Sequence, residues 1–352
     1  MEKFESKKPL IIAGPCSAES KEQTLSTALA LAKSGKVDIF RAGVWKPRTK
    51  PNTFAGAGSK ALPWLAEAKR LTGLPIATEV ATTHHIEEAA AYDIDTYWIG
   101  ARTTSNPFSM QEVAEALRGT DKLVLVKNPI NSDIELWMGA LERLAQCNVK
   151  HLALIHRGFS SFGASLLRNA PMWHLALEMR RRVPELPIIC DPSHICGRRD
   201  MIADIAQQAA DLNYDGLIIE SHISPECAKS DAEQQLTPEA LHTLLDSIKW
   251  RSTSSSSAEF QVALDEVRSR IDNFDSEIFR LLAERMNASE EIGHIKRENN
   301  VMILQSERWE SIVQRILSQY RNSGLSEEFL RTLLDAIHIE SINRQNRVMK
   351  GK

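Results

Sequence analysis

The sequence lacks several features that would place it in a special class of protein. Its 352 residues contain no apolar run near the roughly 20 residues of a membrane-spanning helix, and the polar start MEKFESKK has no apolar signal-peptide core. Positive charge is not in excess, because the formal net charge is −3, which argues against nucleic-acid binding. The five cysteines are odd in number and scattered, as reduced thiols of a cytoplasmic protein are. We therefore expect a cytoplasmic globular protein with neither membrane nor nucleic acid as a partner.

A low-complexity segment divides the chain. Residues 251–258, RSTSSSSA, are rich in serine and show no periodicity, which is typical of a flexible linker. Short apolar runs alternate with amphipathic, helix-length segments before this stretch, whereas only helical periodicity follows it. The pattern predicts two domains, residues 1–250 and residues 259–352, joined by the linker 251–258.

The first domain contains eight short apolar stretches separated by helical segments. They are rich in β-branched residues and nearly continuous, as parallel strands buried on both faces are. Eight strand–helix repeats in about 250 residues predict a (β/α)8 barrel. A doubly wound open sheet is the alternative, but it more often shows a Gly-rich dinucleotide-binding turn, which is missing here. The predicted strands are residues 10–13, 37–41, 75–79, 96–100, 123–127, 151–155, 187–190 and 216–220.

Cationic residues follow many of the predicted strands. Active sites of such barrels lie at the carboxyl ends of the strands, so these side chains should meet at one mouth. Converging positive charges in a protein of net charge −3 indicate a polyanionic ligand, such as two phosphates and a carboxylate. Each cation alone could equally lie on a solvated face. The residues are Arg41, Lys46, Arg48, Arg102, Lys127 and Arg157.

A second group of strand ends carries metal-ligating side chains. Cys16, His194, Glu220 and Asp231 could surround a divalent transition metal, with Mn²⁺ favoured and Fe²⁺, Co²⁺ or Zn²⁺ also compatible. The alternative is structural, with Cys16 a small buried apolar residue and His194 a hydrogen-bonded core histidine. A metal beside two phosphate pockets suggests a Lewis acid that polarises a carbonyl while the phosphates align the reactants.

The strand-end motifs form an ordered set. They are GPCS (14–17), KPRT (46–49), IGAR (99–102), RG (157–158), DPSH (191–194) and SD (230–231). Over about residues 8–250 this set resembles 3-deoxy-D-arabino-heptulosonate 7-phosphate synthase of type I beta. The resemblance implies condensation of phosphoenolpyruvate with erythrose 4-phosphate, the first step of the shikimate pathway.

The resemblance also implies roles for single residues. Cys16, His194, Glu220 and Asp231 would bind the metal, and Asp191 would contact a substrate hydroxyl or orient its neighbours. Arg48 and Thr49 would hold the phosphate of erythrose 4-phosphate. Phosphoenolpyruvate would be held by Arg41, Lys46, Arg102, Lys127 and Arg157, among which Lys46 is the predicted catalytic residue.

Three features qualify the resemblance. The related 3-deoxy-D-manno-octulosonate 8-phosphate synthase is the alternative, but it typically has Lys-Ala-Asn-Arg where this chain has KPRT, and the proline favours the four-carbon sugar. His156 stands where many relatives have Glu. The first strand begins near residue 10, so we expect no N-terminal regulatory extension.

The region after the linker predicts a long amphipathic helix. Its apolar seam steps by three and four residues and then meets Arg285, a charge that must face an anion. At about 100° per residue, Lys296 lies within ~20° of Arg285, whereas Arg268 points roughly 100° away and could serve a partner subunit. The seam consists of Leu264, Val267, Ile271, Phe274, Ile278 and Leu281.

The last helix shows a similar change from apolar to polar. The stripe of Leu330, Leu334 and Ile337 continues into Ser341 and Gln345. On pattern alone, the tail could be a plain dimerisation domain with polar residues that set the register.

The tail also resembles the all-helical chorismate mutases over about residues 260–349. The matching positions are Arg268, Arg285, Lys296, Glu307, Ser341 and Gln345. The resemblance implies a three-helix domain in an intertwined homodimer, with Arg268 reaching the partner's site and chorismate rearranging to prephenate without a cofactor. Arg285, Lys296 and Gln345 would be catalytic. Ile303 and Ser306 depart from the family pattern, which often has Asp and Arg there.

The two halves together predict a bifunctional shikimate-pathway enzyme, a synthase barrel fused to a chorismate mutase. We expect feedback inhibition of the barrel by prephenate or chorismate, because the tail is the only visible regulator. The alternative keeps the barrel as the enzyme and makes the tail a ligand-sensing and dimerisation module.

Overall fold

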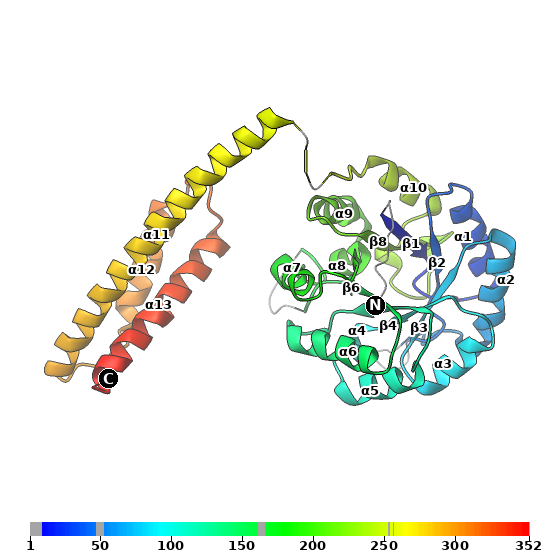
Figure 1. The fold of residues 1–352 in the computed structure, drawn as a ribbon, viewed down its shortest axis with the longest axis horizontal. Helices are drawn as coiled ribbons and strands as arrows, with labels where there is room; N and C mark the ends of the chain where they lie inside the picture. The colour runs from blue at the N-terminus through cyan, green and yellow to red at the C-terminus, as the bar shows by residue number, and fades with distance from the viewer. Residues whose placement is uncertain (1–8, 47–52, 161–165, 253, 256, 352) are drawn as a thin grey trace. The chain divides into compact units, whose positions relative to one another are not determined.

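The computed structural model describes residues 9–46, 53–160, 166–252, 254–255 and 257–351. The chain forms two compact units, Met1–Thr253 and Ser254–Lys352. In the first unit, eight parallel strands in chain order close into a barrel with helices around it (Figure 1). The predicted (β/α)8 barrel is therefore confirmed, and the open-sheet alternative is wrong.

The strands and helices alternate along the first unit. The strands are β1 (Leu10–Gly14), β2 (Ile39–Arg41), β3 (Ile76–Val80), β4 (Thr96–Ile99), β5 (Leu123–Lys127), β6 (His151–His156), β7 (Ile188–Cys190) and β8 (Gly216–Glu220). The helices are α1 (Lys21–Ala32), α2 (Leu62–Thr72), α3 (Thr83–Ala90), α4 (Ala101–Thr104), α5 (Pro107–Ala116), α6 (Ile134–Gln146), α7 (Trp173–Arg182), α8 (Pro192–Cys196), α9 (Ile202–Asp211) and α10 (Pro238–Ser247).

Two apolar cores hold the barrel together. The larger packs the outward side chains of the strands against the helices, and the smaller fills the barrel interior. The interior core includes Ile39 on β2 and Ile218 on β8. Because side chains alternate along a strand, Arg41 and Glu220 lie on the same face as these residues, two positions further on. Four further charged residues also lie two positions after a residue of the interior core, namely Glu79, Lys127, Arg157 and Asp191.

The DPSH motif makes the turn from β7 into α8. Asp191 is the N-cap residue, and its carboxylate accepts a hydrogen bond from the backbone N–H of His194 at 3.1 Å. Pro192 occupies the first helical position, where its missing N–H costs nothing. The strand end and the cap together place His194 in the first turn above the barrel mouth.

The second unit consists of α11 (Ala258–Glu298), α12 (Ser306–Gln319) and α13 (Glu327–Met349), with α13 packed along α11 (Figure 1). The predicted three-helix domain is confirmed. The apolar seam of α11 is open to solvent in one protomer, since Ile271, Phe274 and Ile278 are 51%, 62% and 52% exposed. Among the described residues, no helix has the length and apolarity needed to cross a membrane.

Gly14, at the end of β1, lies too close to the backbone of β2 to carry a side chain. Gly14 has φ +150°, and a Cβ there would lie 2.0 Å from the backbone oxygen of Arg41. Gly73 has φ +73° with nothing within 4 Å, so its alanine variant isolates the backbone strain alone. We expect Gly73→Ala to cost about 1 kcal/mol and Gly14→Ala about 3 kcal/mol or more. Urea denaturation gives the change in the free energy of unfolding for each variant from the shift in midpoint, provided that the slope m is unchanged. Equal costs for the two variants would contradict the packing argument.

Candidate active sites

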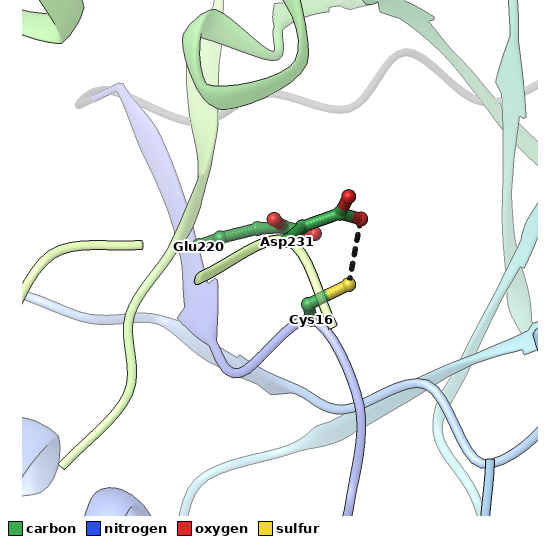
Figure 2. Close-up of side chains that lie close together, drawn as sticks. All are labelled: Cys16, Glu220 and Asp231. Carbon is green, nitrogen blue, oxygen red and sulfur yellow. Dashed lines mark hydrogen bonds between the residues drawn. The ribbon is translucent and has the colours of Figure 1, made fainter. Parts of the chain in front are cut away.

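Three of the predicted metal ligands lie together at the barrel mouth. One ligand atom from each of Cys16, Glu220 and Asp231 lies within 4.8 Å of the others (Figure 2). Cys16 follows β1, Glu220 ends β8, and Asp231 lies in the loop beyond β8. The Cys16 thiol donates a hydrogen bond to Asp231 Oδ2 at 3.2 Å (Figure 2). A thiol and two carboxylates from separate loops suit a divalent transition metal.

His194 lies beside this cluster. Its Nε2 is 3.8 Å from Glu220 Oε1, and its Nδ1 is 2.9 Å from Asp191 Oδ2. Burial lowers the pKa of His194, which favours the neutral imidazole. With its proton on Nδ1 and shared with Asp191, the ring presents the Nε2 lone pair toward Glu220. A carboxylate behind a histidine in this way is the usual support for a metal ligand.

The protonation states of the cluster fit a cation. Burial, together with Glu220, raises the pKa of the Cys16 thiol to about 12. Burial alone would also raise the pKa of Asp231, but the positive charges of Arg168 and Lys46 hold it well below its usual value. Arg41 and Lys46 likewise lower the pKa of Glu220 against the effect of burial. Two ionised carboxylates beside a thiol that can release its proton form a donor set that a divalent ion would complete.

A cationic cavity of about 240 Å³ adjoins the cluster. Asp231 of the cluster lines this cavity, and so does His194, which lies beside the cluster. The predicted cations in its wall are Lys46, Arg102, Lys127 and Arg157. Arg48 and Thr49, the predicted phosphate ligands, lie outside the residues that the structure describes.

Arg41 lies fully buried at the end of β2. Its Nη2 is 3.1 Å from Glu220 Oε1, and its guanidinium lies 4.7 Å from the centroid of the Trp98 ring. Nε and Nη1 are buried without a hydrogen-bond partner among the described residues. Unpaired donors on a buried cation are costly unless an anion completes them, so Arg41 is set to receive a ligand.

The other cations are also held by buried partners. Lys127 Nζ lies 2.8 Å from Asp191 Oδ2, and burial lowers the pKa of Lys127. Burial also lowers the pKa of Arg157 to about 10. Burial alone would lower the pKa of Lys46, but Cys16 and Glu79 raise it. Arg157 therefore remains positively charged at neutral pH, while Asp191 favours the charged form of Lys127 and Glu79 that of Lys46.

Sequence reasoning missed several residues of this site. Glu79 and the pair Arg168 and Asn169 line the cavity. Asn169 accepts a hydrogen bond from Arg157 at 3.0 Å and donates one to the backbone oxygen of His194 at 2.6 Å, so it links the cations to the metal ligands. The two-residue spacing would have identified Glu79, but Arg168 and Asn169 lie in a loop without periodicity.

His156, the predicted departure from the family pattern, faces the outer core. Its Nδ1 is 2.8 Å from the Tyr214 hydroxyl, and its ring packs edge-on against Trp173. Burial lowers the pKa of His156 to about 4, so the ring is neutral. His156 thus supports the backbone ahead of Arg157 without adding charge to the cavity.

The helical unit contains a second cavity, of about 760 Å³. Arg285 donates a hydrogen bond to the Ser341 hydroxyl, and Lys296 donates one to the backbone oxygen of Ile303 at 2.6 Å. Gln345 Oε1 is buried without a partner among the described residues. The structure brings together five of the six predicted residues in its wall: Arg285, Lys296, Glu307, Ser341 and Gln345.

The sixth predicted residue, Arg268, does not line this cavity. Its side chain is 62% exposed and lies 3.5 Å from Asp265 on the same helix. Arg308 and Arg315 line the cavity and were missed by sequence reasoning, since exposed arginines on a helix are common. Ile303 lines it as well, close to Lys296.

Comparisons with known proteins match each of the two units to a family. The model of the DAHP synthetase I family matches residues 4–257, and that of chorismate mutase type II matches residues 267–346. A phospho-2-dehydro-3-deoxyheptonate aldolase of Thermotoga maritima is 34% identical over 239 residues, 68% of each chain. A 2-dehydro-3-deoxyphosphooctonate aldolase of Bradyrhizobium diazoefficiens is 28% identical over 250 residues, 65% of this chain and 84% of that one.

Solved structures place the barrel in the same group. The crystal structure of the Thermotoga maritima DAHP synthase superposes with a TM-score of 0.61 at 32% identity, covering 68% of this chain and 67% of that one. A truncated form of that organism's 3-deoxy-D-arabino-heptulosonate 7-phosphate synthase gives 0.59 at 31% identity, covering 68% and 84%. The chain therefore belongs to the DAHP synthetase I family, with a type II chorismate mutase domain at its C-terminal end, and is a bifunctional enzyme of the shikimate pathway that has both activities.

Proposed function

We propose that the barrel joins phosphoenolpyruvate to erythrose 4-phosphate at the shared edge of its cationic cavity and its donor cluster. The observation that carries this proposal is that Asp231 belongs to both, and that His194, 3.8 Å from Glu220 of the cluster, also lines the cavity. A divalent ion, for which we propose Mn²⁺, would be held by Cys16, His194, Glu220 and Asp231. When bound, such an ion supplies a Lewis acid for the aldehyde of erythrose 4-phosphate.

The chain's own residues would hold the two substrates. Phosphoenolpyruvate would be bound by the cavity cations Lys46, Arg102, Lys127 and Arg157 together with Arg41, which is buried behind the cavity wall and has unpaired donors. Arg48 and Thr49 would hold the phosphate of erythrose 4-phosphate. C3 of phosphoenolpyruvate then attacks the aldehyde carbon, water adds at C2, and the phosphate group leaves as inorganic phosphate. Asp191, whose carboxylate pairs with Lys127 and His194, would act by orienting them.

Removal of the metal tests the barrel site. We expect chelator-treated wild-type protein to lose phosphoenolpyruvate consumption and to regain it with added Mn²⁺, because the donor cluster then has its cation again. Cys16→Ser, which exchanges a soft ligand for a weak hard one, should bind Mn²⁺ at least about tenfold more weakly. Cys227→Ser, at an exposed cysteine, is the matched control. Condensation that continues at full rate after chelation would refute the metal site.

The cavity of the helical unit would bind chorismate, and the rearrangement to prephenate would take place there. Arg285 and Lys296 are cations suited to hold the two carboxylates of chorismate in the compact conformer. Lys296 and the amide NH2 of Gln345 would donate to the ether oxygen and stabilise the negative charge that develops there. Ser341 and Glu307 would complete the contacts to the substrate. No covalent step is needed.

We also propose that prephenate or chorismate in this cavity inhibits the barrel. We expect Arg285→Ala to lower chorismate turnover by about 10²-fold or more, because a cation in the wall is lost. Phosphoenolpyruvate consumption without prephenate should stay at the wild-type rate, and its inhibition by prephenate should disappear. Arg280→Ala, on the same helix but exposed and paired with Glu277, is the control.

The same experiment separates the two views of the tail. Loss of both turnover and inhibition supports an enzyme whose active site is also the sensor. Loss of inhibition from a protein that never turned over chorismate would support a purely regulatory module. Turnover and inhibition that both survive Arg285→Ala would reject the assignment of the cavity.

A homodimer through the helical unit is the assembly that we propose. The exposed seam of α11, with Ile271, Phe274 and Ile278, is large and apolar for a solvated surface. Arg268 lies on α11 outside the cavity of its own protomer, where a partner could receive it. The five free cysteines are consistent with a cytoplasmic location, which we also propose.

Mixing of inactive variants tests whether Arg268 acts in the partner. Arg268→Ala and Arg285→Ala should each lose mutase turnover when purified alone. After subunit exchange, half of the dimers would be mixed, each with one intact site, so about a quarter of the wild-type turnover should return. Recovery that stays at the level of the separate variants would show that both residues serve one protomer. Sedimentation of Ile271→Glu should reveal monomers if the seam forms the interface.

A further inference from the structure

Gln234 lies between the two carboxylates of the donor cluster. It ends the short 3-10 turn Ala232–Gln234 in the loop after β8, and its side chain is buried. Its amide Nε2 donates a hydrogen bond to Glu220 Oε2 at 2.7 Å. Its Oε1 accepts one from Arg168 Nη1, also at 2.7 Å. The same Nη1 lies 3.1 Å from Asp231 Oδ1. A continuous chain of hydrogen bonds therefore runs from Glu220 through Gln234 and Arg168 to Asp231.

The chemistry of this position requires an amide. Glu220 Oε2 accepts the hydrogen bond at one end, whereas the Arg168 guanidinium at the other end can only donate. Only a side chain that donates at one end and accepts at the other can join them. A carboxylate at position 234 would repel Glu220, an ammonium would repel Arg168, and an apolar group would remove the hydrogen bonds to Glu220 Oε2 and from Arg168. An amide of glutamine length meets all of these demands.

Arg168 is placed for this contact by the helix that carries His194. Its backbone N–H donates to the oxygen of Cys196 at 3.2 Å, next to Gly197 at the end of α8. A Cβ on Gly197 would lie 2.5 Å from the Cβ of Arg168, so the loop can approach α8 only because residue 197 is glycine. The Arg168 side chain is 44% exposed, yet its guanidinium reaches inward to Asp231 and Gln234.

The chain of hydrogen bonds counters the repulsion between the two carboxylates of the cluster. Two ionised carboxylates within metal-ligand distance repel each other before a cation arrives. The bond from Gln234 occupies Oε2 of Glu220, while Oε1 accepts from Arg41 at 3.1 Å and lies 3.8 Å from His194 Nε2. Arg168 neutralises part of the charge on Asp231 and holds its Oδ1, while Oδ2 accepts the Cys16 thiol. Each carboxylate thus keeps one oxygen directed at the cluster.

We propose that Gln234 is a positioning residue that holds the metal ligands in their binding arrangement before the ion enters. It holds Glu220 directly and Asp231 through Arg168. The inference rests on the proposed metal site and goes beyond it, since Gln234 touches neither the ion nor a substrate. It predicts a defect in metal affinity and not in the chemical step.

Titration of the chelated full-length protein with Mn²⁺ alone, with free Mn²⁺ read by electron paramagnetic resonance, tests the proposal. Gln234→Met keeps the length of the side chain but removes both hydrogen bonds. We expect it to raise the Mn²⁺ dissociation constant about 10- to 100-fold, while kcat at saturating Mn²⁺ stays within about twofold of wild type. Gln208→Met, at an exposed glutamine of α9, should bind Mn²⁺ as wild type does.

A double-variant cycle tests whether Gln234 acts through Arg168. Arg168→Met should weaken Mn²⁺ binding on its own. The double variant should raise the Mn²⁺ dissociation constant by less than the product of the two single fold-changes, because both substitutions break the same chain of bonds. If Gln234→Met does not fold, Arg168→Met carries the same expectation at a half-exposed position. Wild-type affinity in both variants, or a kcat at saturating Mn²⁺ that falls without a change in affinity, would overturn the inference. Cys16→Ser is the reference: if it too binds Mn²⁺ as wild type does, the metal site itself is wrong.

Discussion

The closure of eight parallel strands into one barrel is the constraint on which the rest of the first unit depends. Side chains alternate along each strand, so the residue two positions after an interior apolar residue must point into the mouth. Ile39 therefore determines where Arg41 points, and Ile218 does the same for Glu220. Eight strands end at one rim, and charges from distant parts of the sequence meet in a small volume.

This convergence creates an electrostatic problem that the fold resolves with buried pairs. Arg41 is paired with Glu220, and Lys127 with Asp191, all four with almost no exposed surface. A buried ion pair is seldom a net source of stability, because desolvation opposes the attraction. Its value here is orientation, because each pair fixes a charged side chain at the barrel mouth, and Arg41 keeps two buried nitrogens without a hydrogen-bond partner among the described residues. The loop residues Asn169 and Gln234 extend the same principle with neutral amides.

The helical unit depends on a different constraint, an apolar surface without enough partners in its own chain. Three helices bury few residues, among them Met286, Leu330 and Val348. Polar residues Ser341 and Gln345 continue the buried stripe of α13 into the wall of the cavity, where Ser341 accepts a hydrogen bond from Arg285. The polar cavity thus lies between the packed helices, whereas the apolar seam lies on a surface of α11 that no other described helix of the unit covers.

The sequence alone determined the order of the elements, the barrel, the helical tail and most candidate residues, because strand alternation and helical periodicity act over short distances. The strand ends predicted Cys16, Arg41 and Glu220, and the seam that stops at Arg285 predicted the second cavity. Only the tertiary structure decided which of these residues touch, and it alone revealed Arg168, Asn169 and Gln234. These three lie in loops, where no repeat in the sequence encodes direction and where position depends on packing against distant residues such as Gly197.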